Sequence, residues 1–195
     1  MSEFARHGGD VPSLGVNAKE KAERDARWVG DWSDNLTVAI ALKEWEKAVD
    51  LAEQGMYSLS VHTRAYLYSG QAKAGVMPAL AAKLPPLKEQ LISSLLNSLS
   101  LPSNRRTMAV TLISLLNRLK AGAAARKTFL EMRAQVIQGL VRKIPFEGYI
   151  ETYIGELAIV FFIGIKHTAD WYLASFKENE VASCKLNLYP ALLDI

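Results

Sequence analysis

The chain has 195 residues, of which half are hydrophobic, and a formal net charge of +3. It is long enough to bury one sizeable core or two small ones, and it is too apolar for an intrinsically disordered chain. The small positive charge does not indicate a nucleic-acid-binding protein, and the single cysteine, Cys184, excludes a disulfide within the chain and favours a reducing compartment.

The N-terminal part of the sequence has no clear helical pattern. Residues 1–30 are expected to be a disordered lead, or a segment added for expression, with room for a short helix. The stretch up to Gly15 contains Gly and Pro, and it lacks the basic-then-apolar pattern of a secretory signal. A helical-rod region is expected over residues 31–177, and a divergent tail over residues 178–195.

The first strong helical pattern follows Asp31 and Ser33, which are residue types that cap helix starts. An apolar stripe then recurs at spacings of three and four, which is the spacing of one helix face. The stripe consists of Leu36, Ala39, Leu42, Trp45, Val49, Ala52 and Met56. One helix is therefore predicted from this cap to Gly55, a residue type that often follows a helix end.

Prolines and glycines divide the middle of the chain. A looser helix is predicted from Tyr57 to Met77. The pair Pro85 and Pro86 is expected to prevent an uninterrupted helix, with Pro86 in the first turn of a new one. Pro102 is expected to end that new helix, whose apolar side consists of Leu91, Ile92, Leu95, Leu96 and Leu99.

Three further helices are predicted after Pro102. Ser103 is expected to cap the first of them, and Gly122 marks its end. The second runs from about Ala123 to Ile144, where Pro145 stops it. The third and most apolar runs from about Tyr149 to Phe176, and 28 residues would make it about 42 Å long.

No segment alternates polar and apolar residues for long enough to indicate a strand. The fold is therefore predicted to be all-α, with antiparallel amphipathic helices that form an elongated bundle or rod. The longest uninterrupted apolar run, from Leu157 to Ile165, is shorter than the roughly 20 residues of a membrane-spanning helix, so no membrane span is expected.

The residues that usually carry catalysis do not form a recognisable set. His7, His62 and His167 are too few and too scattered for a typical zinc site or catalytic triad. The motifs GxSxG, GxGxxG after a strand and CxxC are missing from the sequence. We expect no enzyme activity, no cofactor, no metal ion, no nucleic acid and no small-molecule substrate.

Basic residues are concentrated between Leu101 and Pro145, where Glu131 is the single acid. Such a region pairs with acidic residues elsewhere in the fold, lies in solvent, or presents a positive surface to an acidic partner or an anionic membrane. The candidate surface for these partners consists of Arg105, Arg106, Arg118, Lys120, Arg142 and Lys143.

A structural ion pair is predicted between the last two helices. Glu156 lies among apolar residues at helical spacing, and Arg126 and Arg133 lie seven residues apart on the preceding helix. A buried carboxylate is costly unless it is paired and hydrogen-bonded. We therefore expect Glu156 to meet Arg126 or Arg133 and to fix the register of the two helices.

Three segments are distinctive in their order and spacing: NLTVAIALKEWEKAVDLAEQG (35–55), ARKTFLEMRAQVIQGLVRKI (125–144) and FEGYIETYIGELAIVFFIGIKHTADWYLASF (146–176). Together they resemble the C-terminal helical region of the eighty-four-type subunit of the exocyst vesicle-tethering complex. The resemblance covers about residues 31–176. The family's N-terminal coiled coil and pleckstrin-homology domain have no counterpart here, and the sequence departs from the family after Cys184, so a fragment or a variant is expected.

The resemblance implies a structural subunit that binds other exocyst subunits through helix packing. Such a subunit helps to tether secretory vesicles to the plasma membrane in exocytosis, from the cytoplasmic side and without catalysis. Two alternatives remain at this point. One is a membrane-surface module that contacts anionic lipids through the basic stretch, and the other is an unassigned helical scaffold.

Overall fold

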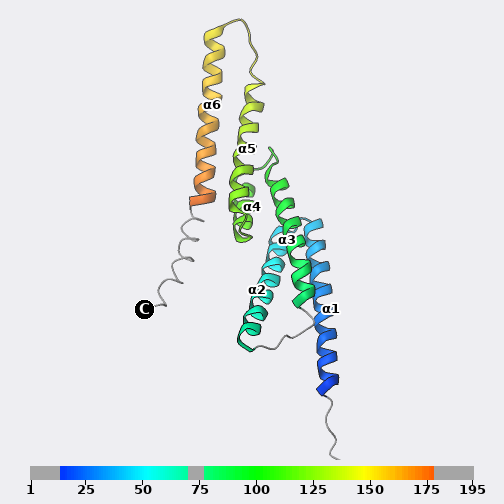
Figure 1. The fold of residues 1–195 in the computed structure, drawn as a ribbon. Coiled ribbons are helices and arrows are strands. Elements are labelled where there is room, and N and C mark those ends of the chain that lie inside the picture. Colours follow the sequence, from blue (N-terminus) through cyan, green and yellow to red (C-terminus); the bar gives the residue numbers. More distant parts are fainter. Residues whose placement is uncertain (1–13, 70–76, 178–195) are drawn as a thin grey trace, which may run out of the picture.

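The computed structural model describes residues 14–69 and 77–177, and every regular element in these ranges is a helix. The elements are α1 (Leu14–Ala41), α2 (Trp45–Ser69), α3 (Met77–Leu99), α4 (Arg106–Arg118), α5 (Gly122–Val141), α6 (Ile150–Tyr172) and a short π-helix, η1 (Leu173–Lys177). Consecutive helices run antiparallel (Figure 1). The predicted all-α bundle of antiparallel helices is confirmed.

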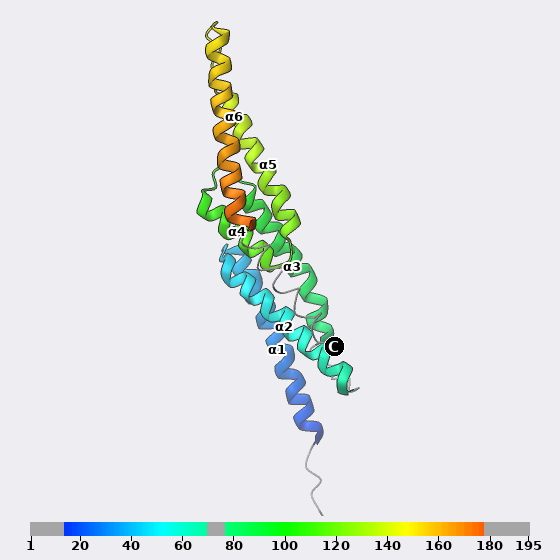
Figure 2. The ribbon, with the colours of Figure 1, turned by 90° about the vertical axis from the view of Figure 1, so that its left-hand side faces the viewer.

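The helices form an elongated molecule, and different helices make up its two ends (Figures 1 and 2). At one end α1, α2 and α3 pack against one another, and α3 also packs against α4 and α5. At the other end α5 and α6 form an antiparallel pair, and η1 returns to contact α4. The centre of the buried core is rich in leucine and includes Leu36, Leu91, Leu95, Leu99, Leu112, Leu116 and Phe129.

The first helix starts at Leu14, well before Asp31, so the predicted start at Asp31 and Ser33 is wrong. Ser33 is buried inside α1, and its hydroxyl donates a hydrogen bond to the carbonyl of Gly30 (2.9 Å). Serine can satisfy its hydroxyl on the preceding turn of a helix as well as at a cap. The residue type alone therefore did not locate the helix start.

The predicted single helix that ends at Gly55 is also wrong, because the chain turns between α1 and α2. Lys43 has a left-handed backbone conformation, with φ of 59°. Its N–H donates to the carbonyl of Ile40 (3.1 Å), and the N–H of Glu44 donates to the carbonyl of Ala39 (2.9 Å). These two bonds form a Schellman motif, in which a glycine usually takes the left-handed position.

A second helix ends in the same way, again with a lysine. Lys120 follows α4 with φ of 63°. Its N–H donates to Asn117 (2.9 Å), and the N–H of Ala121 donates to Leu116 (2.9 Å). Lysine therefore occupies both left-handed positions, and lysine in a sequence does not predict a helix end as glycine does.

Gly55 lies inside α2, where it makes room for a tryptophan. A Cβ atom at this position would lie 2.5 Å from the ring of Trp32 and 3.2 Å from Leu84. Trp32 donates its indole N–H to the carbonyl of Leu51 (2.8 Å), which joins α1 to α2. The glycine thus permits close packing of three helices, and it is not a stop.

Helix α3 passes through Pro85 and Pro86 without a break, contrary to the prediction. A proline cannot donate to the carbonyl four residues earlier, and the carbonyls concerned belong to Ala81 and Ala82. Both alanines and both prolines are exposed, so water can solvate the carbonyls, while Leu84 on the opposite side is buried. Burial of the apolar side stabilises the helix despite the two missing hydrogen bonds.

The later helices begin and end close to their predicted positions. The cap of α4 is Arg105 and not Ser103, and it makes no side-chain cap hydrogen bond. Asn104 closes the end of α3 by donating to the carbonyls of Ser98 (2.7 Å) and Leu99 (3.1 Å).

Candidate interaction surface

Helices α5 and α6 approach closely at a single glycine. Gly164 is the buried residue of α6, and a Cβ atom there would lie 2.7 Å from Cγ1 of Ile137 on α5. Most of the less exposed positions of α6 recur at helical spacing and form one seam, which includes Tyr153, Leu157, Val160, Gly164, Thr168 and Trp171. Helix α6 is thus covered along one side.

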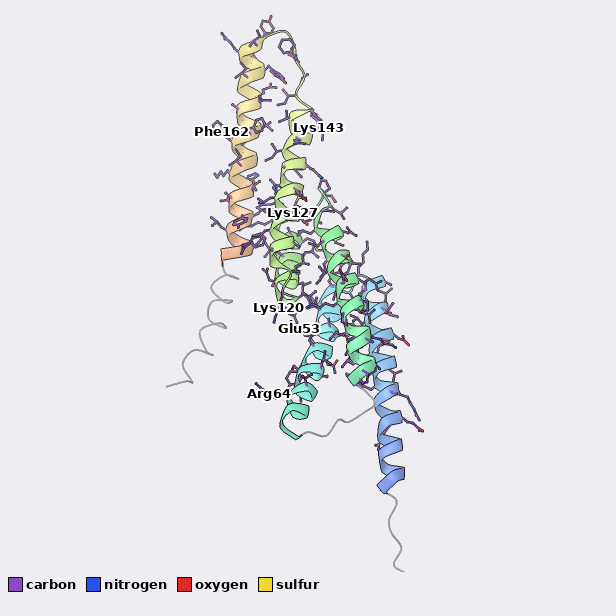
Figure 3. All side chains as sticks on the ribbon, in the orientation of Figure 1. Glu53, Arg64, Lys120, Lys127, Lys143 and Phe162 are labelled. Atoms are coloured by element: carbon purple, nitrogen blue, oxygen red, sulfur yellow. The ribbon has the colours of Figure 1, made fainter. Side chains whose placement is uncertain are left out.

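The remaining sides of α6 are exposed, and between Ile159 and Ile165 every exposed residue is apolar. Phe162 is 74% exposed and points away from α5 (Figure 3). We call the following set the exposed α6 surface: Ile150, Ile154, Ile159, Phe161, Phe162, Ile163 and Ile165. Monomeric proteins rarely expose many large apolar side chains close together, and such surfaces mark sites of protein or membrane contact.

Sequence reasoning found α6 but not its exposure. A helix that is apolar on all sides is usually buried in a core or spans a membrane. The sequence signal that could have indicated this exposure is the lack of a polar face between Leu157 and Ile165. Only the structure shows that, among the described helices, α5 is the main one that packs against α6.

The segment from Ile150 to Phe176 is long and apolar enough to cross a membrane by length and composition, and 6% of its most apolar part is buried. Core helices of soluble proteins can have the same length and composition, although they are mostly buried, so length and composition alone do not separate a lipid environment from a protein one.

Aromatic residues anchor the C-terminal end of α6 and η1 to the rest of the molecule. The ring centroid of Phe129, on α5, lies 6.5 Å from Tyr172 and 6.0 Å from Phe176. The guanidinium of Arg126 lies 5.6 Å from the centroid of Phe176. The helices α5 and α6 are therefore firmly packed near Phe176, whereas Ile150 and Ile154 at the start of α6 are exposed.

Arg133 is a buried cation in the α5–α6 seam. Its side chain and backbone together are 8% exposed. Nε donates a hydrogen bond to the hydroxyl of Thr168 (3.1 Å), and the guanidinium lies over the ring of Trp171, 4.6 Å from its centroid. Burial lowers the pKa of the Arg133 guanidinium from its ordinary value, yet arginine remains protonated at neutral pH.

The structure places Glu156 away from both arginines. Arg133 meets α6 at Thr168, and twelve residues of helix separate Thr168 from Glu156, or about 18 Å. Arg126 lies still further along, at Phe176, and Glu156 is exposed. Helical periodicity indicates which residues share a face, but it does not give the register between two helices.

The predicted basic surface is spread over the molecule. Lys120 precedes α5 and Arg142 follows it, so the two lie about 30 Å apart. Figure 3 shows Lys120 and Lys143 at different ends of this helix. Arg105 and Arg106 are exposed at the start of α4, while Lys143 is exposed beside Arg142.

Arg118, the remaining member of the predicted basic surface, is paired within the chain. Its Nε donates to Glu53 (3.0 Å), and its Nη2 donates to Glu53 (2.7 Å) and Asp50 (2.6 Å). These hydrogen bonds raise the pKa of Arg118. They join α4 to α2, so this arginine contributes to the fold.

Within residues 14–69 and 77–177, no group of three His, Cys, Asp or Glu side chains is placed to hold a metal ion. The arrangement offers apolar contact area on α6 and one buried cation beside it.

Comparison with known proteins identifies the family to which this helical chain belongs. Residues 27–188 match the family described as "Exocyst component 84 C-terminal". The chain is 38% identical over 160 residues to the exocyst complex component EXO84 of Cryptococcus neoformans, which covers 82% of this chain and 22% of the relative. It is 27% identical over 175 residues to exo84 of Aspergillus fumigatus, covering 90% of this chain and 24% of the relative.

A human relative, exocyst complex component 8, is 28% identical over 169 residues, covering 85% of this chain and 22% of the relative. The chain therefore spans less than a quarter of the length of these relatives. No solved structure matches the chain. Since the family match extends over most of the sequence, the chain belongs to the family of exocyst component 84 C-terminal regions.

Proposed function

We propose that this chain is a structural part of an exocyst subunit and that it docks other subunits of the complex through helix packing. In this role it contributes to the tethering of secretory vesicles to the plasma membrane from the cytoplasmic side, without catalysis. The observation that carries the proposal is the exposed α6 surface. Apolar area of this kind is typically covered by a partner in permanent assemblies. The relatives, whose names describe components of the exocyst complex, support the choice of partners.

The test is recovery of exocyst subunits from a secretory cell lysate. The variant Ile154→Gln/Phe162→Gln changes two side chains that are 57% and 74% exposed. Each substitution should change the free energy of unfolding by no more than about 0.5 kcal/mol. We expect the folded variant to recover much less of the other subunits, which are identified by mass spectrometry.

A matched control is available at the opposite end of the molecule. Tyr57 on α2 is 70% exposed, and Tyr57→Gln removes a similar aromatic area. This control should recover the subunits as the unchanged chain does. Equal recovery by the α6 variant and the control would contradict the proposal.

A membrane-surface role through the basic residues has less support, because Arg118 is paired internally and Arg142 and Lys143 lie about 30 Å from Lys120, at the other end of α5. Flotation with vesicles of anionic lipid separates the two functions. An electrostatic lipid contact weakens between low and high salt, because ions screen it. Salt-sensitive flotation that is abolished by Arg142→Gln/Lys143→Gln would favour the membrane role.

A further inference from the structure

The groove between α5 and α6 combines apolar walls with a buried positive charge. It has a volume of about 490 Å³ and is lined by residues that include Leu130, Arg133, Ile137, Ile165, Tyr172 and Leu173. Leu130, Ile165 and Leu173 are 48%, 58% and 53% exposed, so the walls face solvent. Because Ile165 also belongs to the exposed α6 surface, the groove continues that surface.

Arg133 has no acidic partner in this groove among residues 14–69 and 77–177. Among the described residues, no carboxylate lies within 4.0 Å of its guanidinium, and Thr168 is its hydrogen-bond acceptor. A guanidinium has five N–H donors. A buried charge is costly unless it is paired, and removing one partner of a buried pair leaves the other uncompensated.

Thr168 and Trp171 fix the direction of this cation. The hydroxyl of Thr168 accepts from Nε of Arg133 and donates to the carbonyl of Gly164 (2.7 Å), so its orientation is set by the α6 backbone. The ring of Trp171 supports one face of the guanidinium. Both contacts hold the planar group in place, which favours bidentate binding of a carboxylate.

From the apolar walls and the uncompensated cation, we propose that the groove binds a helix of another exocyst subunit, and that this helix places an Asp or Glu among apolar residues so that its carboxylate pairs with Arg133. The inference rests on the proposed docking function of α6 and specifies the chemistry of the partner. The apolar residues of the partner contact Leu130, Ile165 and Leu173, and the carboxylate supplies the missing counter-charge.

The decisive variant is Arg133→Met, which keeps most of the side-chain volume and removes the charge. In the free chain it removes an uncompensated buried cation, so the thermal midpoint should stay the same or rise. In a complex reconstituted from this chain and the other exocyst subunits, affinity should fall at least tenfold, as expected for loss of a buried charge pair. If Arg133 served only the fold, Arg133→Met would lower both the thermal midpoint and the affinity.

Two further variants make the outcome independent of folding at Arg133. Ala134 is exposed and lines the same groove. Ala134→Glu places a carboxylate beside the cation and repels the acid of the partner, so affinity should fall with no loss of stability. Lys127→Met is the control, because this lysine lies on α5 with a side chain that is 78% exposed and outside the groove. Its affinity should stay within twofold of the unchanged chain.

The occupant is identified with a photo-crosslinking amino acid at Leu173 in the reconstituted complex. The expected product is a crosslink to an apolar helix of another subunit that contains an Asp or Glu. Replacing that acid by Arg should then restore binding to Arg133→Glu. Crosslinks to residues 178–195 of this chain, to a second copy or to lipid would overturn the inference, as would unchanged affinity of Arg133→Met and Ala134→Glu.

The two proposals fail in different ways. If Ile154→Gln/Phe162→Gln weakens assembly while Arg133→Met and Ala134→Glu do not, the docking function stands and the acidic partner helix is wrong. If none of the three variants weakens assembly, the docking function itself is wrong.

Discussion

Individual side chains determine where the helices of this chain end and how closely they pack. Two helices end at lysines with positive φ, Lys43 and Lys120, where glycine is the usual residue. A left-handed conformation costs a residue with a Cβ about 1 kcal/mol or more. Lysine in these positions is therefore tolerated because the surrounding helices fix the turn.

Lys43→Gly should raise the free energy of unfolding by about 0.5–1 kcal/mol, because glycine adopts φ of 59° without steric cost. Denaturant unfolding monitored by circular dichroism measures the change. Lys47→Gly, at an exposed position inside α2, is the control and should lower stability by about 1 kcal/mol. A destabilised Lys43→Gly variant would show that the lysine side chain itself is required.

Gly55→Ala should lower the free energy of unfolding by about 1–3 kcal/mol, since the added methyl group overlaps the ring of Trp32. The indole N–H bond to Leu51 should weaken as the ring moves, and a shift in tryptophan fluorescence would report this. Gly139→Ala is a suitable comparison, because a Cβ there has no neighbour within 4 Å. Gly139→Ala should leave stability unchanged or raise it.

The helices after Pro102 were largely predictable, while the ends of α1, α2 and α3 and the register between α5 and α6 were not. The apolar stripes after Pro102 gave α4, α5 and α6 within a few residues, because burial of one face dominates in long amphipathic segments. The turn at Lys43 and the passage of α3 through Pro85 depend on tertiary packing that no local pattern encodes. The groove at Arg133 was not predicted for the same reason, since helical spacing alone led to the expectation that Glu156 meets Arg126 or Arg133.

Close contact between α5 and α6 should depend on Gly164. Gly164→Leu places a side chain against Ile137, so the pair should separate and the free energy of unfolding should fall by about 1–3 kcal/mol. Combining it with Ile137→Ala should recover part of the loss, because the two residues are in contact. Additive effects in this double-mutant cycle would show that the contact does not set the spacing of the helices.

The molecule as a whole is densely packed around α4 and sparsely packed along α6. Helix α4 is held by buried residues such as Leu112, Ile113 and Leu116, whereas Gly164 is the buried residue of α6. Regions with few buried contacts open locally at a lower free energy than the core. Local stability should therefore decrease along α6 toward Ile150.

Hydrogen exchange provides the test of this gradient. Backbone amides of residues 150–162 should exchange faster than those of residues 109–119 in the free chain, and they should become protected when the other exocyst subunits are added. Mass spectrometry after timed labelling resolves the two segments. Equal protection of both segments in the free chain would contradict the gradient.

The uncovered side of α6 also bears on how much of this polypeptide a cell can hold. A copy synthesised without a binding partner exposes several isoleucine and phenylalanine side chains to water. Such a copy is prone to aggregation, chaperone binding and proteolysis. Orphan copies would then be cleared, so the steady level of the polypeptide follows the supply of whatever covers that helix.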